Sequence, residues 1–163
     1  MNLLMYIGGA SAVLGSALVG GVFFAFSSFV MKALARVPAA EGIAAMQSIN
    51  IVVINPSFLG AFIGTAVLSV GVAGVALSDP GKLSSMYLLG GAVFYFVGTF
   101  LVTILGNVPL NDQLAAVTAA DPDAAEIWAI YLERWTMWNS TRTVAAMVAA
   151  VLFTISLLQR AGS

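Results

Sequence analysis

Long apolar runs separated by short polar segments dominate the chain. Four runs come near the length of about 20 residues that a helix needs to cross a bilayer. They predict helices at about 4–31, 56–77, 86–105 and 123–159. The first run is too long for a signal-peptide core and lacks a basic segment before it, so we expect a retained helix. The pattern predicts an all-α integral membrane four-helix bundle, with residues 1–163 as a single transmembrane domain.

Helix-capping residues mark where two of these helices begin. Asn55 followed by Pro56 predicts an N-cap and a first helical position, and Asp121 followed by Pro122 predicts a second start of this kind. A helix from Pro122 to Gln159 would be about 57 Å long at 1.5 Å per residue. The hydrocarbon core of a bilayer is only about 30 Å thick. The fourth helix is therefore expected to project beyond the membrane or to kink.

The first and third connections are longer than turns and resemble each other. Val37-Pro38 opens one and Val108-Pro109 opens the other, and an acidic residue and an Ala-rich stretch follow at matching distances. We predict a short interfacial helix in each connection. We also infer a weak internal repeat of helix, Val-Pro break, interfacial helix and helix. A chance likeness between two Ala-rich amphipathic segments is the alternative.

Small residues recur at every fourth position in three of the predicted helices. They are Gly8, Ala12, Ser16 and Gly20 in the first, Gly60 and Gly64 in the second, and Ala145 and Ala149 in the fourth. Such stripes allow helix backbones to approach closely in lipid. We expect contacts within the bundle, and a dimer seam is the alternative.

Composition removes several classes of function. The chain is 61% hydrophobic and 8% charged, with a net charge of −1, whereas soluble domains carry about 25% charged residues. There is no basic surface for nucleic acid. The chain has no cysteine and no histidine, which removes thiol chemistry, His-ligated haem and imidazole metal ligands. All seven acids fall in connections or near helix ends, so we predict no metal site and no cofactor.

Chemically informative side chains gather where the fourth helix enters the membrane. The helical stripe contains Arg134, Trp138 and Arg142, with Trp135 and Asn139 beside them and Tyr131 one turn before. Arginine at membrane depth is costly unless it is paired, bound or held at the interface. Guanidinium groups flanked by indoles suit a flat, electron-rich or anionic organic molecule. The alternative is a belt of interfacial anchors. Asn50 and Asn139 favour binding, because an amide in apolar surroundings must be hydrogen-bonded.

Two motifs carry a family resemblance that extends along essentially the whole chain. They are Gly-Thr-Phe-Leu-Val-Thr-Ile-Leu-Gly-Asn-Val-Pro-Leu-Asn-Asp at 98–112 and Arg-Trp-Thr-Met-Trp-Asn-Ser-Thr-Arg-Thr at 134–143. The chain resembles the anthrone oxygenase-like family of small four-helix membrane proteins. The resemblance implies oxygenation of an anthrone to an anthraquinone without metal or organic cofactor. The positions that match the family pattern are Asn107, Pro109, Asn111, Arg134, Trp138, Asn139 and Arg142.

Given this resemblance, residues can be assigned to roles. The predicted catalytic residues are Arg134, Arg142 and Asn139, and the predicted substrate-binding residues are Trp135, Trp138, Tyr131, Asn107 and Asn111. The arginines would lower the pKa of the substrate and hold the developing negative charge. The proton acceptor stays open among Glu133, Asp112, Tyr131 and water.

Other functions stay open beside the oxygenase. A non-catalytic small-molecule binder or an accessory subunit of a larger membrane complex is the main alternative. A transporter or channel is a weaker one, because no ionisable residue is predicted at mid-membrane depth. The expected partners are a small aromatic ligand and the lipid bilayer, with no nucleic acid, and a homo-oligomer or larger complex is open. The expected location is the inner (plasma) membrane of a bacterium, with its orientation undetermined.

Overall fold

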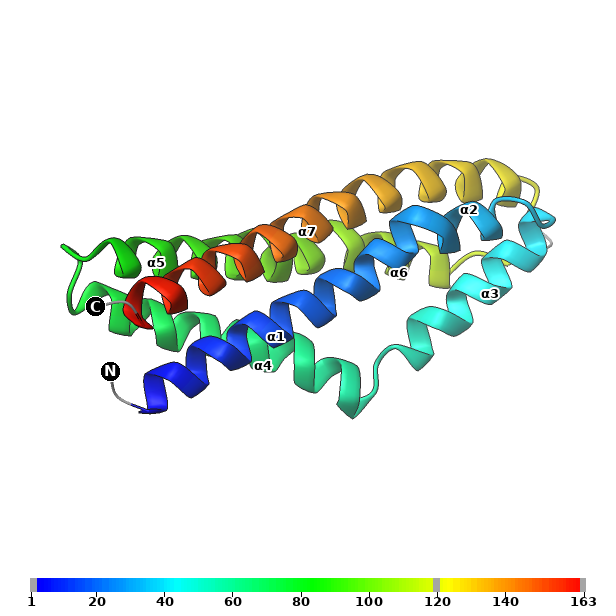
Figure 1. The fold of residues 1–163 in the computed structure, drawn as a ribbon. Helices are drawn as coiled ribbons and strands as arrows, with labels where there is room; N and C mark the ends of the chain where they lie inside the picture. The colour runs from blue at the N-terminus through cyan, green and yellow to red at the C-terminus, as the bar shows by residue number, and fades with distance from the viewer. Residues whose placement is uncertain (1–2, 119–120, 162–163) are drawn as a thin grey trace.

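The computed structural model describes residues 3–118 and 121–161, and every regular element among them is a helix (Figure 1). Four helices are long and apolar enough to cross a membrane: Met5–Leu34, Pro56–Leu77, Leu83–Ala115 and Ala124–Ala161. The first turn of the first helix and the last turn of the fourth lie at the same end of the molecule (Figure 1). The protein is thus an all-α integral membrane bundle, as the apolar pattern predicts.

The first span consists of three helical segments in continuous succession. These are α1 (Leu3–Ala25), the π-helical segment η1 (Phe26–Val30) and α2 (Met31–Leu34). The helix ends before Pro38, which is extended (φ −51°, ψ 143°) and precedes α3 (Ala39–Val52). The predicted break and the predicted short helix of the first connection are both present.

The second span, α4 (Pro56–Leu77), has the predicted bounds. The Asn55 side chain accepts a hydrogen bond from the Phe58 amide at 3.0 Å and caps the helix. The turn that follows α4 contains an ion pair between Lys82 and Asp79, with 2.6 Å between Nζ and Oδ2.

The third span is longer than predicted and does not break at its Val-Pro pair. It is made of α5 (Leu83–Tyr95), the π-helical segments η2 (Phe96–Leu101) and η3 (Thr103–Asn107), and α6 (Val108–Ala115). A proline inside an α-helix clashes with the carbonyl four residues before it. The π-helical segment η3 ends at Asn107, two residues before Pro109. Its wider turn leaves room between the proline ring and that carbonyl, so the helix continues through Pro109. The predicted interfacial helix is therefore an extension of the third span.

The π segments support the predicted internal repeat. Both η1 and η2 end seven residues before a Val-Pro pair, at Val30 and Leu101 respectively. π-helical turns are rare, so two of them at matching positions are stronger support than the Ala-rich composition of the connections. The two halves differ after these segments: α2 follows η1 and its helix ends before Pro38, whereas η3 follows η2 and the helix continues through Pro109.

The fourth span, α7 (Ala124–Ala161), has 38 residues and runs about 57 Å. It begins two residues later than the Asp-Pro signal predicts. The Asp121 carboxylate accepts hydrogen bonds from the hydroxyl and the amide of Thr118, both at 2.7 Å. It therefore bonds to the loop before α7. These bonds lower the pKa of Asp121 below its ordinary value.

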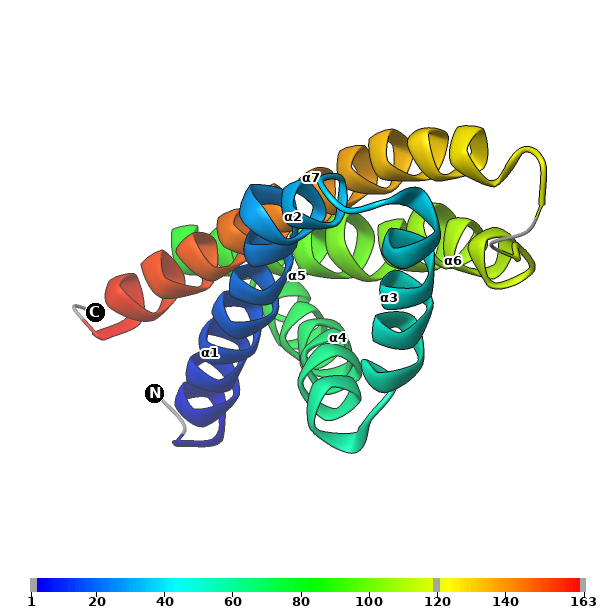
Figure 2. The same cartoon turned by 90° about the vertical axis from the view of Figure 1, so that its right-hand side faces the viewer.

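α7 is unbroken and longer than the hydrocarbon core is thick, so we expect it to project beyond the membrane rather than to kink. Its far end is joined to the start of α5 by a bond from Ser156 to the Ser84 carbonyl. From Arg160 at that end to Arg142 the helix rises about 27 Å, close to the hydrocarbon thickness of about 30 Å. The N-terminal half of α7, before Arg142, continues beyond the level of Arg142 together with α2, α3 and α6 (Figures 1 and 2).

Two apolar cores follow from this arrangement. The membrane core comprises Ala12, Val19, Phe23, Phe62, Ala66, Val72, Ala76, Leu88, Ala92, Tyr95, Ala149 and Phe153. The projecting core comprises Met31, Ile43, Met46, Leu114, Ala124, Trp128, Tyr131 and Trp135. A layer of polar side chains lies between the two cores, and Arg142 is part of it.

Glycine contacts confirm the predicted bundle stripes in α1 and α7 but not in α4. A Cβ at Gly20 would lie 3.2 Å from Ala146, so these helices approach closely. Gly60 and Gly64 meet nothing within 4 Å, so the prediction that they make bundle contacts is wrong. The apolar core uses the opposite face of α4, where large side chains such as Phe62 are available.

The close approach at Gly91 predicts a stability difference. A methyl group there would lie 2.7 Å from the Phe153 ring, which is fully buried. We expect Gly91→Ala to destabilise the protein by about 1–3 kcal/mol through overpacking. The matched control Gly64→Ala should be neutral or slightly stabilising. Thermal unfolding in detergent measures both, and equal melting temperatures would contradict the packing described here.

Candidate functional site

The polar layer is centred on Arg142, whose side chain is only 5% exposed. Its Nε and Nη2 donate to Asn139 Oδ1 at 3.1 and 2.8 Å, and its Nη1 donates to Thr103 Oγ1 at 3.1 Å. The guanidinium carbon lies 3.8 Å from the centre of the Phe23 ring and 5.2 Å from that of Trp135. Phe23 also contacts Phe58, in the first turn of α4. Arg142 therefore lies level with the first turn of α4.

The Arg142 charge has no counter-ion in the described part of the chain. No carboxylate of residues 3–118 or 121–161 lies within 4.0 Å of it, and the ion pair seen there joins Lys82 to Asp79. Dipoles and aromatic faces hold the guanidinium instead. A buried, unneutralised charge is expensive. It leaves a positive potential that an anion could use.

Asn139 connects Arg142 to the first span. It is fully buried, and its Nδ2 donates to the Phe23 carbonyl and to Ser27 Oγ, both at 2.7 Å. Both Nδ2 protons thus have an acceptor, and Asn139 Oδ1 accepts from Arg142, so every polar group of this amide has a partner. The network fixes both the orientation of the amide and the register of α7 against α1.

The partners of this layer outside α7 come mainly from π-helical segments. Ser27 belongs to η1, Thr99 to η2, and Thr103 and Asn107 to η3. Thr99 Oγ1 donates to the Arg142 carbonyl at 3.3 Å. π bulges are frequent at functional sites because they re-aim side chains within a helix. Three of them around one buried cation indicate a specialised site.

Asn107 has hydrogen-bonding capacity to spare. It is 1% exposed, and its Nδ2 donates to the Trp135 carbonyl at 3.1 Å. Its Oδ1 has no partner among the described residues. Buried acceptors are nearly always satisfied by protein or water, so a water or ligand donor fits here.

Tyr131 and Trp135, which are predicted to bind the substrate, are buried in the projecting core. Asn111 Oδ1 accepts from Tyr131 Oη at 2.9 Å and from Trp135 Nε1 at 2.8 Å. Asn50 donates to the same Tyr131 oxygen at 3.4 Å. Trp128, Tyr131 and Trp135 stack in sequence, with ring centres 5.6 and 6.3 Å apart. These rings stack on each other, and their role toward a ligand stays a prediction.

The predicted stripe on α7 divides into two faces. Tyr131, Trp135, Asn139 and Arg142 are buried together, whereas Arg134 is exposed. Trp138 is 37% exposed and packs on Gly106, where a Cβ would lie 2.8 Å from the indole. The structure thus brings one predicted arginine into the layer and leaves the other outside it.

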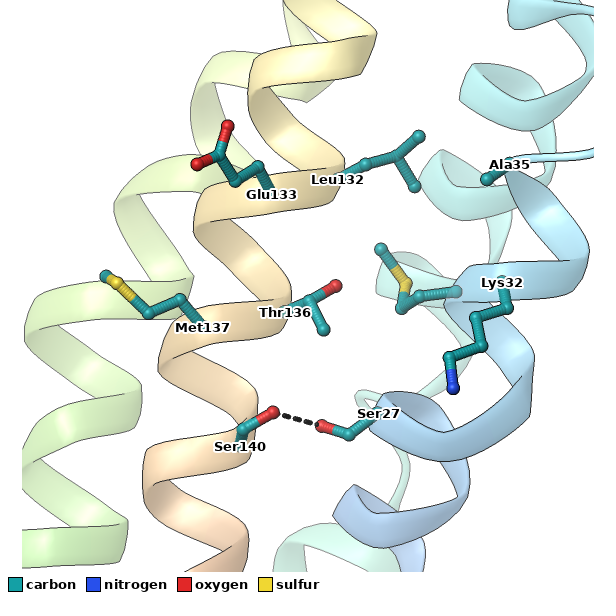
Figure 3. A pocket seen from close by; sticks show the side chains of 9 residues that line it. Ser27, Lys32, Ala35, Leu132, Glu133, Thr136, Met137 and Ser140 are labelled. Atoms are coloured by element: carbon teal, nitrogen blue, oxygen red, sulfur yellow. Dashed lines mark hydrogen bonds between the residues drawn. The ribbon is translucent and has the colours of Figure 1, made fainter.

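A groove of about 440 Å³ runs between α7 and the first span (Figure 3). It is linked to Arg142 through Asn139, which donates to the lining residue Ser27. Its lining consists of Ser27, Met31, Lys32, Ala35, Leu132, Glu133, Thr136, Met137 and Ser140. Leu132 and Thr136 point across the gap, and the hydroxyls of Ser27 and Ser140 meet at one end (Figure 3). Of the candidate proton acceptors, Glu133 lines this groove, Asp112 is exposed elsewhere and Tyr131 is buried.

Sequence reasoning missed the groove. Ser27, Thr136 and Ser140 are small hydroxyl residues that lipid-buried helices often contain, so they carry no signal alone. The recurrence of residues 133, 136, 137 and 140 on one face of α7 could have indicated it. As for metals, no cluster of three or more His, Cys, Asp or Glu side chains occurs in the parts of the chain that the structure describes.

These features define a small all-α membrane protein with a buried, unneutralised arginine beside a groove. Residues 52–152 match the anthrone oxygenase family, and the chain belongs to this family. The matched region includes Asn107, Asn111, Asn139 and Arg142, whereas Ser27 lies outside it. No curated protein and no solved structure matches the chain.

The double acceptor role of Asn111 leads to a prediction about the projecting core. Asn111→Leu leaves the Tyr131 hydroxyl and the Trp135 indole N–H without this acceptor. Each unsatisfied buried donor costs about 1–3 kcal/mol, so we expect a lower melting temperature and altered tryptophan fluorescence. The neighbouring, exposed Asp112→Asn is the control and should change neither. Loss of stability in the control alone would contradict the assignment.

Proposed function

We propose that this membrane protein oxygenates a phenolic, anthrone-like aromatic molecule without a resident metal or organic cofactor. The observation that supports this most directly is the Arg142 guanidinium, which is buried and has no counter-ion within reach in the described residues. Such a charge favours an anionic form of a bound molecule, and an anion is what this reaction needs. Membership of the anthrone oxygenase family supports the substrate class.

The proposed reaction needs only a base, a site for the anion and O2. The substrate methylene loses one proton and gives an electron-rich phenolate. This anion passes one electron to O2, and the resulting radical pair combines to a peroxide at the former methylene carbon. The proton that the base removed returns to the peroxide, and loss of water, which also takes the second methylene hydrogen, leaves a ketone. One atom of O2 ends in the product and the other in water.

We assign the substrate to the groove beside Asn139. Pockets for small ligands have volumes of about 300–1,000 Å³ and mostly apolar walls with a few polar groups. The groove, at about 440 Å³, fits this description. Glu133 is the carboxylate that lines it, and we assign it as the proton acceptor. Arg142 supplies positive charge from the layer behind Asn139.

The remaining predicted roles are part of this proposal. Asn107 offers a free acceptor to a water or substrate donor, and Asn111 holds Tyr131 and Trp135 in place. The partners are a small aromatic ligand and the bilayer, with no nucleic acid, and an oligomer or larger complex stays open. We place the protein in the plasma membrane of a bacterium.

The decisive test measures O2 uptake by the full chain in nanodiscs with an anthrone. We expect Arg142→Gln to lower the rate by about 10- to 100-fold, because the charge that favours the anion is lost. Arg142→Lys keeps the charge and should retain more activity than Arg142→Gln. The exposed Thr141→Ala, whose hydroxyl bonds its own helix at the Met137 carbonyl, is the control and should match the unaltered protein.

Arg134→Gln tests the predicted catalytic role of Arg134 separately. Because this side chain is exposed and outside the layer, we expect a smaller loss than for Arg142→Gln.

Normal turnover by well-folded Arg142→Gln would refute the proposal. Tight anthrone binding with no O2 uptake by the unaltered protein would instead support a non-catalytic binder or an accessory subunit.

A further inference from the structure

Two serine hydroxyls lie at one end of the groove, and one of their two hydrogens is not used in the bond between them. Ser27 Oγ and Ser140 Oγ are 2.9 Å apart. Either can be the donor, but one hydrogen bond uses only one of the two hydroxyl protons. The described residues offer this second proton no acceptor: Ser27 otherwise accepts from Asn139, and Ser140 makes no other bond. Both serines line the groove, so the remaining proton is available to a molecule bound there.

The spare donor stands at the end of a chain of aligned hydrogen bonds. Arg142 donates to Asn139 Oδ1, and Asn139 Nδ2 donates to Ser27 Oγ at 2.7 Å. Every bond in this chain points from the buried cation toward the groove. Aligned hydrogen bonds polarise one another in a low-dielectric interior, so the hydroxyl pair is a stronger donor than two isolated serines. The cation itself stays covered, at 5% exposure.

The rest of the groove suits an aromatic body rather than a sugar or a peptide. Met31, Leu132 and Met137 provide apolar and polarisable walls, and thioethers pack well against aromatic rings. Lys32 lies on the wall that the first span provides and adds a second positive charge near the hydroxyls (Figure 3).

We propose that the Ser27–Ser140 pair binds the phenolate or ketone oxygen of a planar aromatic molecule held in this groove. This inference rests on the proposed function for the class of substrate. Ser27 and Ser140 touch the substrate, whereas Asn139 and Arg142 act through them as positioning residues. Ser27 lies in the first span, outside the region that matches the family, so the site needs both the matched region and the span that precedes it.

The test measures binding instead of turnover, with 1,8-dihydroxyanthraquinone as the probe. The full chain is placed in nanodiscs, and the absorbance of the probe is titrated with pH to obtain its affinity and the pKa of its bound phenol. Nanodiscs without protein give the reference for the lipid alone. We expect binding to lower the pKa of the probe, because the site prefers the phenolate.

Ser27→Ala combined with Ser140→Ala should weaken binding of the phenolate by about tenfold and reduce the pKa shift correspondingly, since hydrogen bonds to charged groups have this strength. The matched control is Ser28→Ala. Ser28 is the adjacent serine of η1, but its hydroxyl bonds its own helix at the Phe24 carbonyl, at 2.7 Å. This control should keep both the affinity and the pKa shift. The single variant Ser140→Thr retains a hydroxyl and should keep most of the pKa shift of the probe.

Three results would overturn the inference: no binding beyond that of empty nanodiscs, an unchanged pKa shift in the double variant, or an equal loss in Ser28→Ala. The outcomes also separate this inference from the proposed function. O2 uptake that needs Arg142 but neither serine would refute the hydroxyl site and leave the oxygenase standing. Serine-dependent binding of the probe without any O2 uptake would support the site and refute the oxygenase.

Discussion

The hydrogen bonds between Arg142 and Asn139 are the interaction on which the rest of the site depends. Asn139 reaches the first span at Phe23 and Ser27, while Arg142 reaches the third span at Thr103. Three helices are thereby held at one depth. Apolar packing tolerates sliding between lipid-buried helices, because lipid and side chains are equally apolar. A polar layer does not tolerate it, since a shift of one turn would separate Arg142 from Thr103 and Asn139 from Phe23 and Ser27.

Stability alone does not explain this layer. A buried charge without a counter-ion lowers the stability of the fold relative to an apolar replacement, and the third span also carries two rare π segments around it. The buried charge and the π segments lie together, level with the first turn of α4. Buried charge and rare helical geometry at one place are typical of a functional site. In the proposed function this charge acts on the groove through Asn139 and Ser27.

The predicted internal repeat accounts for the positions of two π segments in this layer. η1 and η2 occupy corresponding positions before the two Val-Pro pairs, and each contributes a hydroxyl residue, Ser27 or Thr99, to the layer. Two similar halves therefore meet at α7 from two sides. Their later divergence, with a break at Pro38 and a continuous helix through Pro109, lets α3 fold back over the projecting core while α6 extends it.

Apolar run length and capping signals determined the membrane class, the four spans and the bounds of α4, because these properties are local. The spacing along α7 also placed Arg142 and Asn139 on one helix. Only the tertiary structure decided which stripe residues share a site. The packing of neighbouring helices determines which face of a helix is buried. Arg142 is therefore buried against the third span, while Arg134 is exposed. The groove was equally hidden, since Ser27 and Ser140 are 113 residues apart and meet only when the first span packs on α7.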